Sequence, residues 1–223
     1  MTSQETAEAP VTPGSPEPKK GSPLIMTISI VILLVLALLG GAVYLGVQIY
    51  VNRSDSPVIR KITEVLPIPA ARLGSHVVLY RDFTESRDTL RRFLDSPAAK
   101  EEGLNVQYDA SLEQNALEKL LVQQALEEIA AQNKVTVTDD ELRQYYSEVL
   151  AATSSTTANP SQYLLDNFGW NEEDFRQNVL RPALLEQKIS AALAGENATD
   201  TDALNRAVAA RMEQPDVVRY VRF

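Results

Sequence analysis

Residues 116–146, ALEKLLVQQALEEIAAQNKVTVTDDELRQYY, decide the fold of this chain. Apolar residues in the first half of this stretch recur every three or four positions, which is the spacing of one face of a helix. Together with a capping box at Ser111 and Gln114, the spacing predicts a long helix that ends near Gln132. Its apolar face is wide, as is typical of a central, buried helix. The residues of that face are Leu112, Ala116, Leu117, Leu120, Leu121 and Ile129.

Further helices are predicted on both sides of the long one. Asn133 is expected to end the long helix in a left-handed conformation, and a second capping box at Thr138 and Glu141 begins the next helix. Caps, stop signals and apolar spacing predict the remaining helices. One runs from 82 to about 94, one covers 160–168 and stops at Gly169, one follows Asn171 and is kinked by Pro182, and the last covers 201–212.

Two short strands are predicted before these helices and one after them. Residues 70–73 and 76–80 flank a turn at Gly74 and Ser75, and residues 217–223 are strand-like. An isolated hairpin is only marginally stable in water, so we expect the last strand to pair with the opening hairpin. The fold is therefore expected to be mainly α, with a small β-sheet formed by the opening hairpin and the C-terminal strand.

One long apolar segment stands apart from this pattern. Residues 24–51 contain no charged residue and no histidine over 28 positions. As a helix, the segment would be about 42 Å long, whereas the hydrocarbon core of a bilayer is about 30 Å thick. A secretory signal has a shorter apolar region of roughly 7–15 residues, so a transmembrane helix is favoured. The chain then divides into a disordered tail (1–23), the transmembrane helix (24–51), a tether (52–66) and a folded domain (67–223).

Composition excludes several classes of function. The chain of 223 residues has no cysteine, which removes disulfides, thiolate metal sites and cysteine nucleophiles. His76 is the single histidine, so histidine-based metal sites and acid–base catalysis are not expected. The net charge of −9 disfavours nucleic acid as a partner, because phosphate contacts need clustered positive charge. No catalytic, cofactor-binding or metal-binding residue is predicted.

Aromatic residues gather in sequence around the polar segment 151–159. The candidates for binding a polypeptide are Tyr145, Tyr146, Tyr163, Phe168 and Trp170. Two readings of this group stay open. The aromatic side chains either form an ordinary helix-packing core, or some of them line an exposed apolar groove of the kind that binds proteins.

The stretch 115–193 resembles the SurA N-terminal-type domain of bacterial extracytoplasmic folding factors such as SurA, PpiD and PrsA-like proteins. Three pieces in order carry the resemblance: the segment 116–146 quoted above, the polar loop, and YLLDNFGWNEEDFRQNVLRPALLEQKI at 163–189. Upstream, ARLGSHVVLYRDFTESRDTL at 71–90 resembles the strand–turn–strand–helix opening of the same domain, with Gly74-Ser75 in place of the more usual Asn-Gly. The final DVVRYVRF resembles the closing strand of such relatives, which implies that the chain is complete.

The resemblance implies a membrane-anchored chaperone on the extracytoplasmic side. The N-terminus would be cytoplasmic, residues 24–51 would contact membrane lipid, and the helical domain would bind unfolded, secreted or newly translocated polypeptides. Many relatives carry a parvulin prolyl-isomerase domain before the last strand, but residues 195–215 are too few to hold one. The expectation is therefore a chaperone-like protein that is not an enzyme and needs no cofactor. The alternatives are a non-catalytic adaptor that binds one partner, such as a translocon component or a complete isomerase, and, third, a prolyl isomerase.

Overall fold

The computed structural model describes residues 23–104, 106–153, 159–194 and 202–223. The predicted tail, apart from its last residue, lies outside these ranges. The chain divides into two units, Met1–Tyr44 and Leu45–Phe223. Helix α1 (Pro23–Tyr50) coincides with the apolar segment, and the side chains of residues 23–35 and 38 are outside the described part. Within the described part of the chain, no helix combines the length and the apolar character that crossing a membrane requires.

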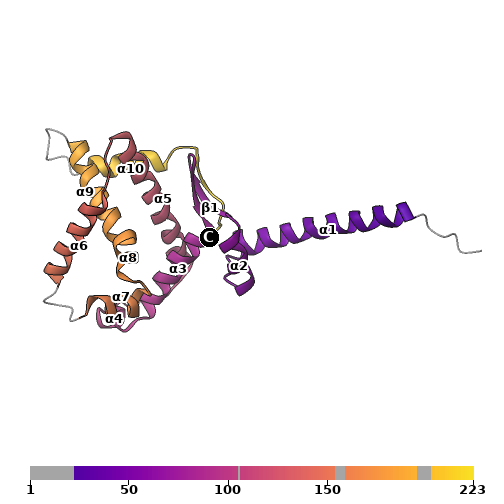
Figure 1. The fold of residues 1–223 in the computed structure, drawn as a ribbon, viewed down its shortest axis with the longest axis horizontal. Coiled ribbons are helices and arrows are strands. Elements are labelled where there is room, and N and C mark those ends of the chain that lie inside the picture. Colours follow the sequence, from indigo (N-terminus) through magenta and orange to yellow (C-terminus); the bar gives the residue numbers. More distant parts are fainter. Residues whose placement is uncertain (1–22, 105, 154–158, 195–201) are drawn as a thin grey trace, which may run out of the picture. The chain divides into compact units, whose positions relative to one another are not determined.

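The second unit is mainly helical and contains a small three-stranded sheet, as the sequence predicts (Figure 1). The hairpin strands β1 and β2 come first, helices follow, and β3 comes last. The elements after α1 are α2 (Pro57–Val65), β1 (Pro69–Leu73), β2 (His76–Leu79), α3 (Tyr80–Asp95), α4 (Pro97–Glu101), α5 (Ala110–Gln132), α6 (Asp139–Thr153), α7 (Pro160–Phe168), α8 (Glu172–Phe175), a π-helical turn (Arg176–Leu180), α9 (Arg181–Ala194), α10 (Ala203–Met212) and β3 (Val217–Arg219).

Helix α5 is the central helix that its wide apolar face predicts. It packs against α3, α9, α10 and β1, and the side chains of Leu117 and Leu121 are completely buried. Its first turn is capped by Asp109 rather than Ser111, because the Asp109 carboxylate accepts hydrogen bonds from the backbone N–H groups of residues 111 and 112.

The end of α5 differs from the prediction at one residue. Asn133 has φ −95°, so it is not left-handed; Lys134, with φ 56°, takes that conformation instead. The Asn133 side chain donates to the Ile129 carbonyl oxygen at 2.8 Å. This bond satisfies a helix-end carbonyl without a left-handed residue at position 133.

The sheet joins the two ends of the domain. Its strand order is β2-β1-β3, and both pairs are antiparallel. Leu73 faces His76 across the two-residue turn, where Gly74 has φ +58°, and Leu73 also faces Val217 of β3. The predicted pairing of the last strand with the opening hairpin is therefore confirmed, although β3 is shorter than the predicted residues 217–223.

The helix that was predicted to be kinked by Pro182 has a widened turn directly before the proline. The turn just before it is π-helical, and the Arg181 N–H reaches back five residues to the Arg176 carbonyl oxygen. A proline cannot donate to the carbonyl one turn earlier and crowds that turn. The widened turn accommodates the ring while the helix continues as α9.

Part of the segment predicted as a tether is folded. Residues 57–65 form α2, which Ser56 caps and which buries Ile59 and Thr63. The preceding loop is fixed by Arg87 of α3, whose side chain is only 2 % exposed. Arg87 Nη1 donates to the Arg53 carbonyl oxygen at 3.0 Å, and Arg87 Nη2 lies 3.2 Å from the Asp55 carboxylate.

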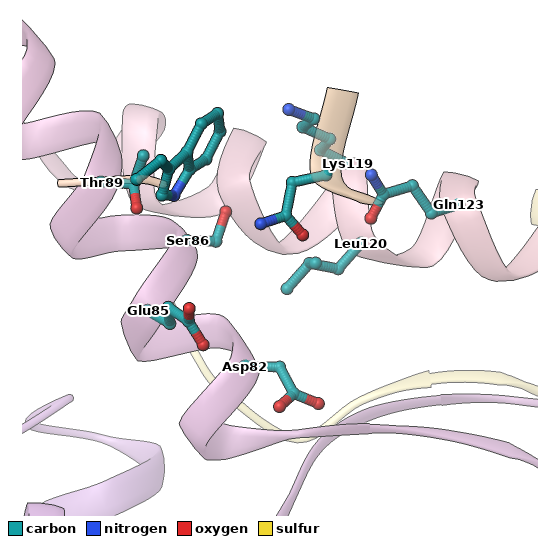
Figure 2. A pocket seen from close by; sticks show the side chains of 9 residues that line it. Asp82, Glu85, Ser86, Thr89, Lys119, Leu120 and Gln123 are labelled. Atoms are coloured by element: carbon teal, nitrogen blue, oxygen red, sulfur yellow. The ribbon is translucent and has the colours of Figure 1, made fainter. Parts of the chain in front are cut away.

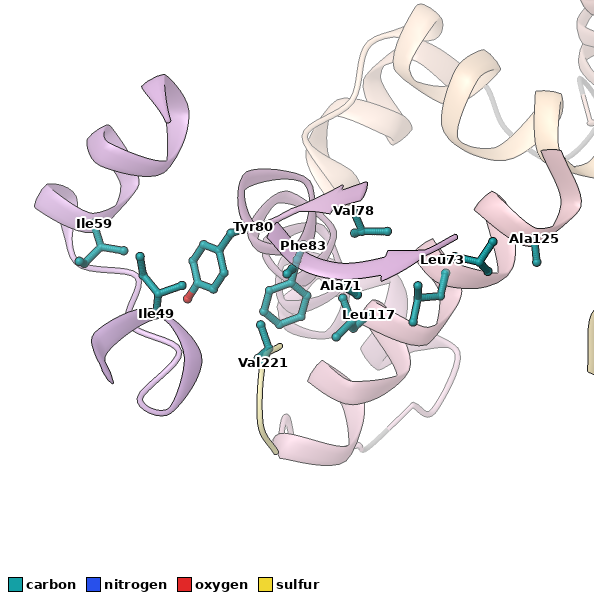
Figure 3. Close-up of a cluster of buried hydrophobic side chains, with 12 residues drawn as sticks. Ile49, Ile59, Ala71, Leu73, Val78, Tyr80, Phe83, Leu117, Ala125 and Val221 are labelled. Atoms are coloured by element: carbon teal, nitrogen blue, oxygen red, sulfur yellow. The ribbon is translucent and has the colours of Figure 1, made fainter. Parts of the chain in front are cut away.

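The last turn of α1 belongs to the main core. Ile49 is 2 % exposed and shares one buried cluster with Ile59, Tyr80 and Phe83 (Figure 3). The Arg222 N–H donates to the Tyr50 carbonyl oxygen at 3.0 Å. The folded unit therefore begins inside the apolar segment, at Leu45, and not after it.

Deletion of residues 216–223 tests the closure of the sheet. The deletion removes β3, the buried Val221 and the two contacts of Arg219 with Glu118 at 2.5 and 2.7 Å. Loss of the Val221 burial alone should cost about 1.5–3 kcal/mol, so the urea midpoint of unfolding should fall. Arg222→Ala, which changes an exposed side chain and keeps the strand, is the control. An unchanged midpoint for the deletion would show that the last segment does not stabilise the domain.

Replacement of Gly169 by alanine tests the left-handed end of α7. Gly169 has φ +74°, and an added Cβ would lie 2.9 Å from the Arg92 guanidinium; Gly103 has φ +73° and open space around it. Each alanine should therefore cost about 1–2 kcal/mol in backbone strain, but only Gly169→Ala should displace Arg92. Trp170 is the single tryptophan, so its emission should shift in Gly169→Ala and not in Gly103→Ala. Tryptophan emission spectra that are the same in the two variants would argue against a contact between Gly169 and Arg92.

Candidate functional site

An apolar groove of about 320 Å³ lies between α3 and α5. Its apolar lining residues come from three places: α3, α5, and the end of α7 with the segment that follows it. Polar side chains at its edges belong to Ser86, Thr89, Asn115 and Lys119. The apolar lining consists of Leu90, Phe93, Leu112, Ala116, Phe168 and Trp170.

Three aromatic rings form a continuous stack along this groove. Phe93 and Phe168 are nearly parallel, at an interplanar angle of 6° and a centroid distance of 5.0 Å. Phe168 and Trp170 stack at 20° and 5.2 Å. All three side chains are partly exposed. The stack therefore presents apolar aromatic surface to solvent instead of closing it inside the core.

Local backbone signals place Trp170 at the end of this stack. Helix α7 stops at Gly169 in the left-handed conformation, and the Trp170 N–H then donates to the Leu164 carbonyl oxygen at 3.3 Å. Directly afterwards, Asn171 and Asp174 form a reciprocal capping box that begins α8. Trp170 is thus held between a helix stop and a helix start, which fixes its backbone.

A smaller, more polar hollow of about 200 Å³ adjoins the groove (Figure 2). Asp82, Glu85 and Thr89 line it from α3, and Lys119 and Gln123 line it from α5. Trp170 borders this hollow as well as the groove. The site therefore offers an apolar surface next to groups that can donate and accept hydrogen bonds, an arrangement that suits a peptide with an apolar side chain and a polar backbone.

The structure brings together three of the five predicted binding residues. Tyr163 lies 6.3 Å from Phe168, ring centroid to ring centroid, so Tyr163, Phe168 and Trp170 are neighbours. Tyr146 instead packs against Phe175 and lies under the Arg176 guanidinium. Burial, with a hydrogen bond to Glu172 as the second cause, raises the pKa of Tyr146. These contacts give Tyr146 a packing role between helices.

Tyr145 lies in a different surface depression, with Leu184 and Lys188 of α9. Lys188 donates a hydrogen bond of 2.5 Å to Glu141, which is on the same helix as Tyr145. This bond is the main cause that lowers the pKa of Glu141 to about 2, and hydrogen bonds from Thr138 lower it further. The ion pair joins α6 to α9. Tyr145 therefore shares a face with an interhelical contact, away from the aromatic stack.

Sequence reasoning did not identify the α3 and α5 side of the groove. Leu112 was expected on the apolar face of the long helix, and no role was assigned to Leu90 or Phe93 of the helix predicted from residue 82 to about 94. Leu112 lies in α5 as expected, but it lines the groove and is only partly buried. The sequence of these helices contains more apolar residues than one buried helix face requires. This surplus was the available signal that some of them line a surface groove.

The single histidine does not line this groove. His76 is exposed at the start of β2, in the hairpin. Among the residues that the structure describes, no three histidine or acidic side chains come together in a way that could hold a metal ion.

Comparison with known families identifies the domain. The model of the SurA-like N-terminal domain matches residues 19–190, which is about three quarters of the chain. The comparisons with curated proteins and with solved structures gave no match. Since the matched range contains α1, the hairpin, the groove and most of α9, the chain belongs to the SurA-like N-terminal domain family, a family of chaperone-type folding factors.

Proposed function

We propose that the chain is a membrane-anchored, extracytoplasmic chaperone-like protein that holds unfolded or newly translocated polypeptides. The observation that carries the proposal is the apolar groove with its partly exposed stack of Phe93, Phe168 and Trp170. Membership in a family of chaperone-type folding factors supports the same reading.

The groove suits weak and reversible binding. Burial of one large apolar side chain contributes about 1.5–3 kcal/mol, and a dissociation constant of 1 mM corresponds to about 4 kcal/mol. A groove that accepts one or two such side chains therefore releases its client readily. Binding and release by burial alone require no nucleotide, metal or covalent step. The acidic chain, with a net charge of −9, keeps a protein that exposes apolar surface soluble.

The anchor that we propose is the first part of the apolar segment. The folded unit takes up the segment from Leu45 onward, which leaves residues 24–44. As a helix, these residues would extend about 31 Å, close to the roughly 30 Å of a hydrocarbon core. The matched family range begins at residue 19 and so includes the whole segment, which favours a retained anchor over a removed signal. Membrane lipid would then be the partner of residues 24–44.

The same proposal gives the chain no enzymatic role. In related proteins, prolyl isomerisation is the work of a parvulin domain, and residues 195–215 are too few to form one. His76, the single histidine, is on the exposed hairpin and not at the groove.

An adaptor that binds one fixed partner, such as a translocon component or a complete isomerase, is the alternative that the first experiment below separates from a chaperone.

Replacement of Trp170 tests the groove. The full chain, held in lipid nanodiscs, should delay the aggregation of several unrelated unfolded proteins, measured by light scattering. Trp170→Ala should weaken binding of these clients about tenfold, equivalent to about 1.4 kcal/mol, because it removes one end of the aromatic stack.

Tyr145→Ala is the matched control for this experiment. It removes an aromatic side chain of similar exposure outside the groove, and it should leave client binding unchanged. Equal losses in both variants would contradict binding at the groove. A chain that delays the aggregation of no client but captures a single membrane partner would be an adaptor.

Limited proteolysis tests the proposed orientation. Lys19 and Lys20 precede the apolar segment, and we place them in the cytoplasm with residues 45–223 outside. Protease added to intact spheroplasts should therefore degrade the C-terminal domain, detected with an antibody against it. A cytoplasmic protein serves as the control for intact membranes. Full protection of the domain until the membrane is opened would contradict the orientation.

A further inference from the structure

Helix α2 has an apolar face that the domain does not cover. The helix buries Ile59 and Thr63 against the body, but Val58, Val65 and the following Leu66 are 66 %, 81 % and 51 % exposed. With the half-buried Ile62, these residues follow the i, i+4, i+7, i+8 spacing of one helix face. The exposed face is therefore organised along the helix, and differs from single apolar residues scattered over a surface.

Charged residues flank this face but do not interrupt it. Lys61 is exposed on its edge, and 100° per residue places it about 60° from Val58 around the helix axis. Arg60, on the side toward the body, is engaged by Asp88 at 2.6 Å and by Asp55 at 3.8 Å. An apolar face with an exposed lysine at its edge is the pattern of a helix that lies in the headgroup region of a bilayer.

The chain connects α2 closely to the end of α1. Only six residues separate Tyr50 from Pro57, and they turn back on themselves: the Ser54 N–H donates to the Gln48 carbonyl oxygen at 2.8 Å, and Arg53 has φ 49°. Ile49 of α1 and Ile59 of α2 share one buried cluster with Tyr80 (Figure 3). The shared cluster places α2 near the point where the apolar segment enters the folded unit.

We propose that the exposed face of α2 lies on the membrane surface, with Val58, Val65 and Leu66 among the lipid headgroups and Lys61 beside an anionic headgroup. The inference rests on the proposed anchor. If residues 24–44 span the bilayer, Leu45 is at its surface, and a helix held next to Ile49 is within reach of the headgroups. Val47 near the end of α1 and Val51 just after it, both also exposed, belong to the same interfacial layer.

The interfacial contact would hold the domain close to the bilayer. A single transmembrane helix is a flexible anchor, whereas the same helix with a second membrane contact through α2 restricts how the domain tilts. The groove would then keep a constant height above the membrane, where a newly translocated segment emerges.

Site-directed spin labelling tests this placement, because a chain without cysteine gives a unique label at each introduced one. Val58→Cys and Val65→Cys report the exposed apolar face, and Glu64→Cys reports another face of the same helix. Val77→Cys, on an exposed position of β2, is the control for an aqueous site in the same domain. The labelled full chains are reconstituted into vesicles of phosphatidylethanolamine and phosphatidylglycerol and purified by flotation. Thermal unfolding of each variant confirms that the domain is folded.

The expected result concerns collisions of the label with oxygen, which dissolves in lipid, and with a polar nickel reagent. The ratio of the two collision rates should be several-fold higher at Val58 and Val65 than at Glu64 and Val77. Labels at Val58 and Val65 that are as accessible to nickel as the label at Glu64, in chains that float with the vesicles, would overturn the interfacial placement and leave the anchor intact.

Two further outcomes would also contradict the inference. Chains that do not float with the vesicles would overturn the anchor and the interfacial helix together. Dipolar broadening between labels at Val65 would show that the face of α2 is covered by a second copy of the chain instead of lipid.

Replacement of Lys61 by glutamine should lower the ratio of oxygen to nickel collision rates at Val65 in the anionic vesicles but not in vesicles of phosphatidylcholine alone.

Discussion

The buried guanidinium of Arg87 sets a constraint on which the arrangement of the domain depends. A charge removed from water is costly unless carboxylates and carbonyl groups compensate it. Arg87 takes its compensation from the loop after α1, through the Arg53 carbonyl oxygen and Asp55, and from Glu113 of α5 at 4.0 Å. Glu113 in turn binds Arg53 at 2.7 Å. The network therefore joins the loop after α1 to α3 and α5, the two helices that flank the groove.

Tyrosine hydroxyl groups extend the same network. The Tyr80 hydroxyl donates to the Ser54 carbonyl oxygen at 3.2 Å, and the Tyr108 hydroxyl donates to Glu113 at 3.1 Å. Burial raises the pKa of both tyrosines to about 12, so they remain neutral donors at any physiological pH. These bonds tie the segment after α1 to α3 and, through the bond of Arg53 to Glu113, to α5, although Arg87 Nε and Nη2 form no hydrogen bond within the described part of the chain. The segment after α1 is consequently a fixed part of the domain, in spite of its polar, loop-like sequence.

Local signals in the sequence were sufficient for most of the elements. The stop at Gly169, the capping boxes at Thr138 and Asn171, and the turn at Gly74 act within a few residues, so each could be predicted from its own neighbours. Long-range contacts could not be predicted this way. Helix α2 depends on Ile59 packing into the distant core, and the aromatic stack depends on Phe93 of α3 meeting Phe168 of α7. Apolar stripes show which residues are available for such contacts but not which partner they meet.

The position of β1 in the sheet affects the order in which the domain can be built. Leu73 of β1 pairs with Val217 of β3, more than 140 positions later in the chain. During translation β1 and β2 leave the ribosome early, and β1 keeps one edge without a partner until the intervening helices have been synthesised. An unpaired edge can accept a strand from another chain, and closure over so long a separation is slow. Each newly made molecule thus passes through an interval in which its own backbone is exposed to mispairing, and the central helix α5, made well before β3, is the element available to shield it.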